Sequence, residues 1–253
     1  MKRSPVFFVA LLIAGLSPAV AYAAPTCDGH KATIVGTDEA DEIQGTDGVD
    51  VIASLGGQDT VNALEGDDIV CGGAGDDGLD GGPGNDIVLG GAGSESNQSH
   101  VSVDPGGDEE PILLTLDQGF IHGGAGDDVL SGGPGDDDLD GFEGADRLVG
   151  GDGNDYLDAG EGDDDLRAGD GDDSSLGGPG DDVAIDTSTN QNYLVGGPGS
   201  DKIVTGAGND DIYGEEGNDI VIAAGGTNYV SGGPGNDRVV AADGDDDIYG
   251  GDG

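Results

Sequence analysis

The sequence has very few of the residues that build an ordinary globular core. Its 253 residues include no tryptophan and one methionine, and aromatic residues make up only 4% of the chain. Glycine, by contrast, supplies 55 residues. A chain of this composition does not form a conventional packed globule. Disorder is the simplest alternative, and only a regular pattern of apolar residues argues against it.

Basic residues are also scarce. Seven lysines and arginines stand against 54 aspartates and glutamates, so the formal net charge is −47. Such a chain repels itself, nucleic acids and anionic membranes, and we therefore expect neither nucleic-acid binding nor membrane insertion. The natural partner of a dense carboxylate array is a hard cation that prefers oxygen ligands, above all Ca²⁺.

The longest apolar run lies at the start of the chain. Residues 1–24 combine a basic start, an apolar run over Val6–Leu16 and small residues around Ala23. This pattern predicts a secretory signal peptide cleaved near Ala23 or Ala24, because the run is too short for a transmembrane helix. A retained anchor is the alternative. No later stretch could span a bilayer, so we expect a secreted, extracellular protein.

Cysteine is limited to Cys27 and Cys71. In an oxidising compartment a disulfide between them is the economical interpretation, and two free thiols are the alternative. Residues 25–35 would then act as a leader or N-terminal cap that folds back to reach Cys71.

From Gly36 to the C-terminus the chain repeats every nine residues. The run Gly72–Asp80 is followed directly by Gly81–Leu89, and both have the pattern G-G-x-G-x-D-x-U-x, where U is a large aliphatic residue. That pattern resembles the calcium-binding nonapeptide of parallel β-rolls. A disordered acidic chain has no reason to keep an aliphatic residue in register at position eight.

Aspartate fills position six of nearly every repeat, in two blocks that cover residues 36–93 and 123–253. These aspartates are the candidate metal ligands: Asp41, Asp50, Asp59, Asp68, Asp77 and Asp86 in the first block, and Asp128, Asp137, Asp146, Asp155, Asp164, Asp173, Asp182, Asp201, Asp210, Asp219, Asp237 and Asp246 in the second. One extra residue near Asp186 breaks the nine-residue step. Residues 94–122 leave the register altogether, and we interpret them as a lateral insertion loop or small hairpin.

The spacing predicts an all-β fold, a parallel β-roll with two repeats in each coil. A six-residue turn precedes a three-residue strand, whose position eight faces inward while positions seven and nine face outward. Position-six carboxylates then stack along two edges of the roll, and successive carboxylates on one edge lie about 4.8 Å apart. At that distance they cannot all stay charged without a cation between them. Those carboxylates and the turn carbonyls offer the oxygens that Ca²⁺ accepts. One buried aliphatic residue per repeat does not offset the cost of ordering nine residues, so folding should be coupled to the binding of multiple Ca²⁺ ions.

The two edges should differ. The turns Thr187–Asn192 and Ala223–Asn228 end in asparagine and fall on the same edge, whereas the opposite edge of the second block keeps aspartate throughout. We expect one continuous calcium ladder and one interrupted ladder. Ser175 and Ala184 occupy core position eight, so residues 174–192 should be the softest part of the roll.

The scattered histidines and the tyrosines carry weaker signals. His30, His100 and His122 are expected in solvated loops. The tyrosines at positions seven or nine should point outward as surface packing; they are Tyr193, Tyr213, Tyr229 and Tyr249.

The chain resembles the RTX, or hemolysin-type, calcium-binding repeat proteins over nearly all of residues 36–253, because more than a dozen of these nonapeptides occur in phase. The resemblance implies a right-handed parallel β-roll ordered by Ca²⁺ after export, with the position-six aspartates and turn carbonyls as ligands. Many family members use a C-terminal export signal, whereas this chain has an N-terminal one. The enzymatic functions known in the family do not carry over.

The expected function is that of a secreted calcium-binding repeat protein, a structural or adhesive extracellular module with a polysaccharide or other surface partner. The alternative is a non-catalytic module of a larger exported enzyme or adhesin complex, with recognition by residues 94–122. An enzyme in its own right is the third hypothesis; we expect no catalytic activity, because no apolar pocket sets one carboxylate apart from its neighbours.

Overall fold

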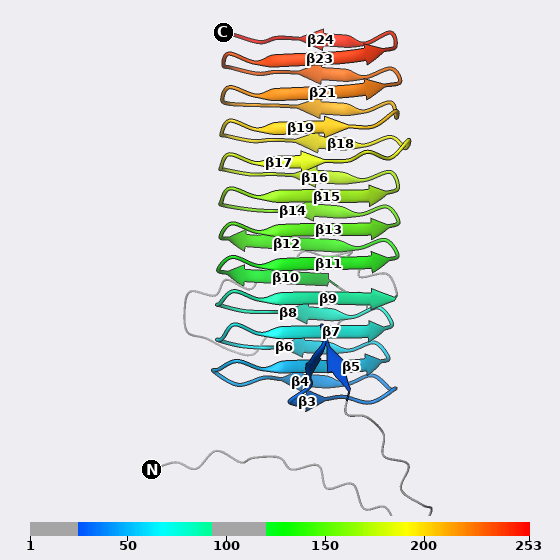
Figure 1. Ribbon diagram of the computed structural model, residues 1–253, viewed down its shortest axis with the longest axis vertical. Helices are drawn as coiled ribbons and strands as arrows, with labels where there is room; N and C mark the ends of the chain where they lie inside the picture. Colours follow the sequence, from blue (N-terminus) through cyan, green and yellow to red (C-terminus); the bar gives the residue numbers. More distant parts are fainter. Residues whose placement is uncertain (1–24, 93–119) are drawn as a thin grey trace, which may run out of the picture.

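Each nine-residue repeat folds into a glycine-rich turn followed by a short strand, and two such repeats complete one coil of a rod (Figure 1). The computed structural model describes residues 25–92 and 120–253. The predicted signal peptide and residues 94–119 of the predicted insertion lie outside the described residues. Within the described ranges, no helix is long and apolar enough to cross a membrane.

Successive strands alternate between two parallel sheets of 11 strands each. The odd-numbered sheet consists of β3 (Ile34–Val35), β5 (Val51–Gly56), β7 (Ile69–Ala74), β9 (Ile87–Ala92), β11 (Val129–Pro134), β13 (Arg147–Asp152), β15 (Asp165–Asp170), β17 (Val183–Ile185), β19 (Lys202–Thr205), β21 (Ile220–Gly225) and β23 (Arg238–Asp243). The even-numbered sheet consists of β4 (Glu42–Gln44), β6 (Thr60–Asn62), β8 (Gly78–Asp80), β10 (Phe120–Ala125), β12 (Asp138–Glu143), β14 (Tyr156–Asp158), β16 (Ser174–Leu176), β18 (Tyr193–Val195), β20 (Asp211–Tyr213), β22 (Tyr229–Ser231) and β24 (Asp247–Tyr249). The expected parallel β-roll is confirmed.

The core is a column of position-eight side chains between the two sheets. Leu139 pairs with Leu157 in the even-numbered sheet and Leu148 pairs with Leu166 in the odd-numbered sheet, and all four are fully buried. Partners lie 18 residues apart, which confirms two nonapeptides per coil. Ser175 and Ala184 take the same inward position, so the core thins there as the sequence predicts.

The turn glycines are required where neighbouring coils approach most closely. Gly151 and Gly153 have φ values of 134° and 145°, a region that residues with a side chain rarely adopt. A Cβ atom on Gly153 would also collide with the carbonyl oxygen of Gly135 in the preceding coil. Positions two and four therefore favour glycine both for backbone conformation and for stacking.

The N-terminal segment forms a small antiparallel hairpin on the outer side of the odd-numbered sheet. Its strands are β1 (Thr26–Cys27) and β2 (His30–Lys31), and β1 contacts β5 and β7. Cys27 and Cys71 form a disulfide with a Cα–Cα distance of 5.7 Å. The hairpin is thereby tied to β7, whose position nine Cys71 occupies.

The roll resumes earlier than the sequence pattern indicates. Strand β10 begins at Phe120 and pairs with β8, and Ile121 is fully buried at position eight. The predicted insertion boundary at residue 122 is therefore three residues too late. The pattern is hidden here because Gly119, instead of aspartate, stands at position six.

The register shows how much chain is added at each irregularity. The amide of Asp86 donates to Oδ1 of Asp128 at 2.5 Å across 42 residues, which is 42 − 18 = 24 more than one coil needs. The equivalent bond from Asp182 to Asp201 spans 19 residues, one more than a normal coil. The extra residue near Asp186 is thus confirmed.

Candidate metal centre

Position-six residues form two columns, one on each edge of the rod. We call the column in the turns that lead into odd-numbered strands the odd ladder, and its counterpart before even-numbered strands the even ladder; they lie at the left and right edges of Figure 1. The odd ladder is Asp50, Asp68, Asp86, Asp128, Asp146, Asp164, Asp182, Asp201, Asp219 and Asp237. The even ladder is Asp41, Asp59, Asp77, Asp137, Asp155, Asp173, Asn192, Asp210, Asn228 and Asp246.

One carboxylate oxygen of most of these aspartates holds the stack together. The amide of Asp146 donates to Oδ1 of Asp164 at 2.7 Å, and the amide of Asp164 donates to Oδ1 of Asp182 at 2.9 Å. The same bond recurs along the odd ladder from Asp50 to Asp237. The structure confirms that one edge keeps aspartate throughout and that the asparagines interrupt the other edge. That calcium ions occupy these ladders stays a prediction.

The other oxygen, Oδ2, is buried and lacks a hydrogen-bond partner within the described part of the chain. This holds for the following aspartates: Asp59, Asp68, Asp77, Asp86, Asp128, Asp146, Asp155, Asp164, Asp173, Asp182, Asp201, Asp210, Asp219 and Asp237. A buried, unpaired carboxylate oxygen is costly, and proteins normally satisfy such an atom with a donor or a cation. Its repetition at nearly every coil makes it a property of the repeat.

Burial also changes the acidity of these groups. The pKa of Asp128 and of Asp182 is raised to about 7, mainly by burial; a backbone hydrogen bond works against this rise, and the stacked carboxylates of neighbouring coils add to it. Burial raises the pKa of Asp146 to about 6. Near neutral pH, a proton and a cation therefore compete for these carboxyl groups.

Backbone carbonyls converge on the same places. A Cβ atom on Gly232 would lie 2.6 Å from Oδ2 of Asp237 and 2.8 Å from the carbonyl oxygen of Gly250 in the next coil. Oxygens from two successive coils thus face one position beside the glycine. Among the described residues, no group of three or more histidine, cysteine or acidic side chains is placed to hold a metal ion by itself, so a cation here would rely on carbonyls as well as carboxylates. Such an all-oxygen donor set fits Ca²⁺ and does not fit Zn²⁺.

The first two turns satisfy Oδ2 in another way. The amide and hydroxyl of Thr46, at position two, donate to Oδ2 of Asp50 at 2.7 and 2.8 Å. The amide and hydroxyl of Thr37 donate likewise to Oδ2 of Asp41. Asp41 and Asp50 therefore differ from the other predicted ligands, because threonine replaces glycine at position two.

The two asparagines provide a second internal substitute. Nδ2 of Asn228 donates to the carbonyl oxygen of Gly225 at 3.0 Å, and Nδ2 of Asn192 donates to Oγ of Ser188 at 3.2 Å. Oδ1 of Asn192 still accepts the amide of Asp173 at 2.9 Å. The amide–Oδ1 hydrogen bond of the ladder is thus kept. The amide nitrogen Nδ2 of asparagine takes the place of Oδ2, and this donor needs no cation.

Asp186 is a candidate ligand that the position-six pattern misses. It is 1% exposed, its Oδ1 accepts the amide of Ser188 at 2.7 Å, and its Oδ2 has no hydrogen-bond donor among the described residues. Burial raises the pKa of Asp186, and its carboxyl group contacts that of Asp173. The one signal in the sequence was the broken nine-residue step in the turn that ends at Asn192.

His122 is not in a solvated loop as expected. It is half-buried in β10, its ring stacks on Phe120 at 4.3 Å between centroids, and Phe142 meets it edge-on at 5.2 Å. Its Nε2 lies 3.3 Å from Oδ2 of Asp140. His30 lies exposed in β2, and His100 lies outside the described residues.

Comparison with known proteins identifies the repeat. The family described as the RTX calcium-binding nonapeptide repeat (4 copies) matches residues 35–70, 44–79, 62–94, 119–148, 140–174, 149–184, 186–221 and 222–253. A search of curated proteins found no match. The family covers nearly all of the rod, and its repeats are the ones that build both ladders. The chain therefore belongs to the RTX calcium-binding nonapeptide repeat family and is a calcium-binding β-roll module.

Proposed function

We propose that this chain is an exported protein whose roll becomes ordered when Ca²⁺ ions enter the two ladders. The observation that carries this proposal is the buried, donor-free Oδ2 that recurs from coil to coil on both edges. A metal-free roll would have to keep these oxygens protonated or leave them unpaired. A bound divalent cation would supply the missing positive charge and bridge successive turns.

The ligands we assign are the aspartates with a donor-free Oδ2, together with carbonyl oxygens of the turns. In the folded roll, their amide–Oδ1 bonds fix the orientation of each carboxylate. Asp186 joins this set and supplies a carboxylate in the one even-edge turn where Asn192 has replaced aspartate. Asp41 and Asp50 are left out, since their Oδ2 atoms already have threonine donors.

The proposed setting is extracellular. Support comes from the signal-peptide pattern of residues 1–24 and from the Cys27–Cys71 disulfide, which suits an oxidising compartment. There the calcium-ordered rod would serve as a structural or adhesive element without catalytic activity. The alternative role, as a recognition module within a larger exported assembly, predicts that deleting residues 94–119 abolishes attachment and leaves calcium uptake unchanged.

The proposal is tested by circular dichroism and small-angle scattering of the mature chain in Ca²⁺ and in chelator. We expect a compact β-rich rod in Ca²⁺ and an expanded chain after chelation, because folding and binding are coupled. Mg²⁺ is the matched control and should restore much less structure, since it sheds its waters reluctantly. Equal compactness in chelator and in Ca²⁺ would refute the proposal.

A further inference from the structure

The few basic residues of the second block all lie on one side of the rod. Arg147, Arg167, Lys202 and Arg238 occupy outward positions seven or nine of odd-numbered strands. The outward positions of the even-numbered sheet carry no lysine or arginine in the described chain. In a molecule with a net charge of −47, this segregation marks the two sides as chemically different surfaces.

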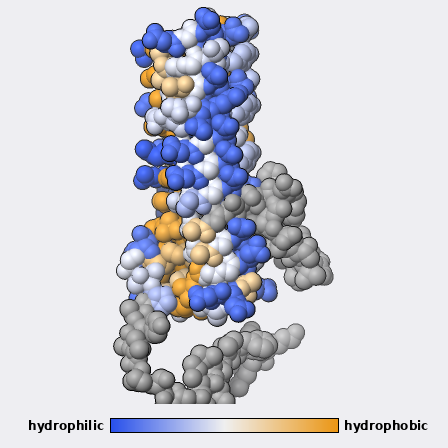
Figure 2. All heavy atoms as spheres, turned by 90° about the vertical axis from the view of Figure 1, so that its right-hand side faces the viewer, coloured by the Kyte–Doolittle hydropathy of each residue, from blue (hydrophilic) through white to orange (hydrophobic). Residues whose placement is uncertain are grey.

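Near its C-terminal end, the outer surface of the odd-numbered sheet is apolar and basic. We call positions seven and nine of β17–β23 the odd face; they hold Val183, Ile185, Lys202, Val204, Ile220, Ile222, Arg238 and Val240. Ile220 and Val240 are 39% and 41% exposed. A second hydrophobic area lies on the lower part of the rod in Figure 2, in the N-terminal block, beyond the charged residues of β13 and β15.

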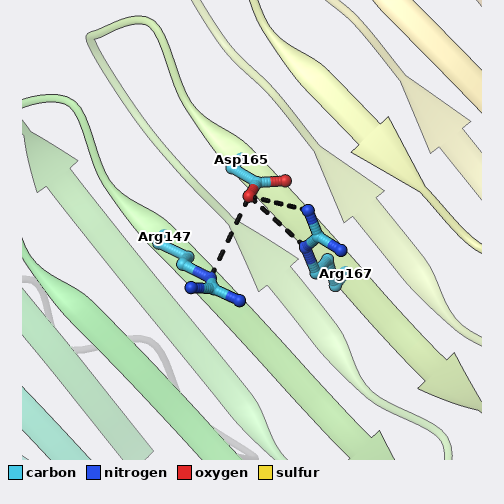
Figure 3. Close-up of polar contacts among 3 residues, drawn as sticks. All are labelled: Arg147, Asp165 and Arg167. Carbon is cyan, nitrogen blue, oxygen red and sulfur yellow. Dashed lines mark hydrogen bonds and ion pairs between the residues drawn. The ribbon is translucent and has the colours of Figure 1, made fainter.

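Acidic residues are nearly absent from this surface. Asp165 is the one acidic residue at positions seven and nine of the described odd-numbered strands, and it lies between two arginines (Figure 3). Its Oδ2 is 3.1 Å from Nη2 of Arg167 and 3.9 Å from Nε of Arg147. Lys202 and Arg238 have no such partner among the described residues, so their charges remain available.

The outer surface of the even-numbered sheet is aromatic and acidic at the same level. We call positions seven and nine of β18–β24 the even face; they hold Tyr193, Val195, Asp211, Tyr213, Tyr229, Ser231, Asp247 and Tyr249. The four tyrosine rings form a stack with successive centroids 5.5, 5.5 and 5.4 Å apart. The tyrosines point outward as predicted.

The charges on the two faces share one spacing. Lys202 and Arg238 both occupy position seven and are 238 − 202 = 36 residues apart, which is two coils. Asp211 and Asp247 also occupy position seven and are 247 − 211 = 36 residues apart. Two cations on one face therefore match two carboxylates on the other, and lysine and arginine also bind well over tyrosine rings.

We propose that calcium-loaded rods associate with each other through the odd face of one copy and the even face of the next. Two odd faces repel each other because cations would meet cations, and two even faces repel each other because carboxylates would meet carboxylates. An odd face and an even face attract each other. Such a contact joins two different surfaces and leaves both free at the ends, so it extends into open assemblies. The hairpin covers the odd-numbered sheet at β5 and β7, which confines the contact to the C-terminal coils. When the odd-numbered sheet of one rod packs on the even-numbered sheet of the next, the two sheets cross at about −30°. The rods then diverge along their length, so the hairpin lies away from the neighbouring rod.

This inference rests on the proposed function, because calcium both orders the two faces and neutralises part of the net charge. The test is sedimentation velocity of the mature chain in Ca²⁺ over a range of concentrations. Lys202→Glu/Arg238→Glu and Asp211→Lys/Asp247→Lys should each lose self-association and remain monomeric. An equimolar mixture of the two variants should recover it, because each then offers the other a complementary face. The off-face control Glu161→Lys/Glu216→Lys changes the net charge as much as the second variant and should still assemble.

Calcium uptake by the same samples separates this inference from the proposed function. A protein that binds Ca²⁺ and folds but stays monomeric at all concentrations overturns the stacking contact alone. A mixture that fails to reassociate also overturns it, as does a wild-type monomer that binds anionic vesicles through Lys202 and Arg238. A chain that takes up no Ca²⁺ contradicts the proposed function, on which the stacking contact depends.

Discussion

The two edges of the rod solve the same stacking problem with different chemistry. On the odd ladder, aspartate recurs in each described coil from Asp50 to Asp237, and nearly every one leaves Oδ2 buried without a donor. On the even ladder, Asn192 and Asn228 place an amide group where that oxygen would be. The ladder hydrogen bond is the same on both edges, so it does not depend on charge.

The comparison separates two jobs that aspartate performs at position six. Oδ1 accepts the amide of the preceding coil, which asparagine does equally well. Oδ2 brings negative charge into a buried place, where a cation or a proton can neutralise it; in the first two turns, threonine donors give it hydrogen bonds instead. We therefore expect the even edge to need fewer ions per coil than the odd edge, and the predictions below remove or invert that difference.

Acidification should erase the difference between the edges and produce the largest effect. Burial raises the pKa of Asp86 and Asp155 to about 7 and that of Asp201 to about 6, above the usual value of 3.8. The folded carboxylates thus bind protons more tightly than unfolded ones. The free energy of unfolding of the metal-free roll should therefore rise as the pH falls through about 7 towards 4, and it should fall again as the pH rises through the folded pKa values.

Circular dichroism in chelator at about pH 8 and about pH 5 measures this gain. The metal-free chain should acquire β structure at the lower pH. In the presence of Ca²⁺ the affinity should change the other way, because protons compete for the same oxygens. A metal-free chain that stays expanded throughout this range would show that charge on the ladders is not what prevents folding.

Asparagine placed in the odd ladder should make that edge resemble the even one. Asp146→Asn/Asp164→Asn keeps both Oδ1 acceptors and removes two charges. Calorimetry should show fewer bound Ca²⁺ ions, and the calcium-loaded form should lose about 3 kcal/mol for each lost site at a hundredfold excess of Ca²⁺ over its Kd. In chelator the sign should reverse, with the variant more ordered than the wild type.

The reverse exchange is the control. Asn192→Asp/Asn228→Asp restores two carboxylates to the even ladder, so the metal-free chain should become more expanded and bind more Ca²⁺. If both double variants change calcium uptake in the same direction, the two edges do not differ in the way described.

The nine-residue period carries most of the fold because each position has one physical role. Leu139 and Leu148 could be placed in the core, and Asp146 and Asp155 on opposite edges, by counting alone. The period says nothing where a residue departs from its role. The start of β10 was placed too late because Gly119 stands at position six, where the pattern requires aspartate.

The site was predicted less completely than the fold, because hydrogen bonds within a turn depend on side-chain placement. The threonine donors of Asp41 and Asp50 need a hydroxyl close to Oδ2, which spacing does not reveal. Asp186 lies outside the repeat numbering, and His122 lies between the ring of Phe120 in its own strand and that of Phe142 in the neighbouring strand. In each case a specific side-chain contact, absent from the linear pattern, decides the role.

Asp186→Asn tests whether the even edge recovers a ligand at its interruption. Asparagine keeps the Oδ1 acceptor for the amide of Ser188 and removes the charge beside Asp173. Calorimetry should show the loss of about one Ca²⁺ ion, worth about 3 kcal/mol at a hundredfold excess over its Kd. Asp181→Asn, an exposed position-five change, is the matched control and should leave uptake unchanged. Unchanged uptake in both variants would mean that Asp186 only caps its turn.

The smallest effect should come from the threonine that replaces a cation in the second turn. Thr46→Val keeps the shape and the backbone donor but removes the hydroxyl bonds to Oδ2 of Asp50 and to the carbonyl oxygen of Gly48. We expect a loss of about 1 kcal/mol in the calcium-loaded form, measured by thermal unfolding, with calcium stoichiometry unchanged. Thr227→Val, at an exposed turn position of the even edge, should have no comparable effect. If Thr46→Val instead lowers the number of bound Ca²⁺ ions, then Asp50 is a metal ligand like the rest of its ladder, and the hydroxyl supports the ion instead of replacing it.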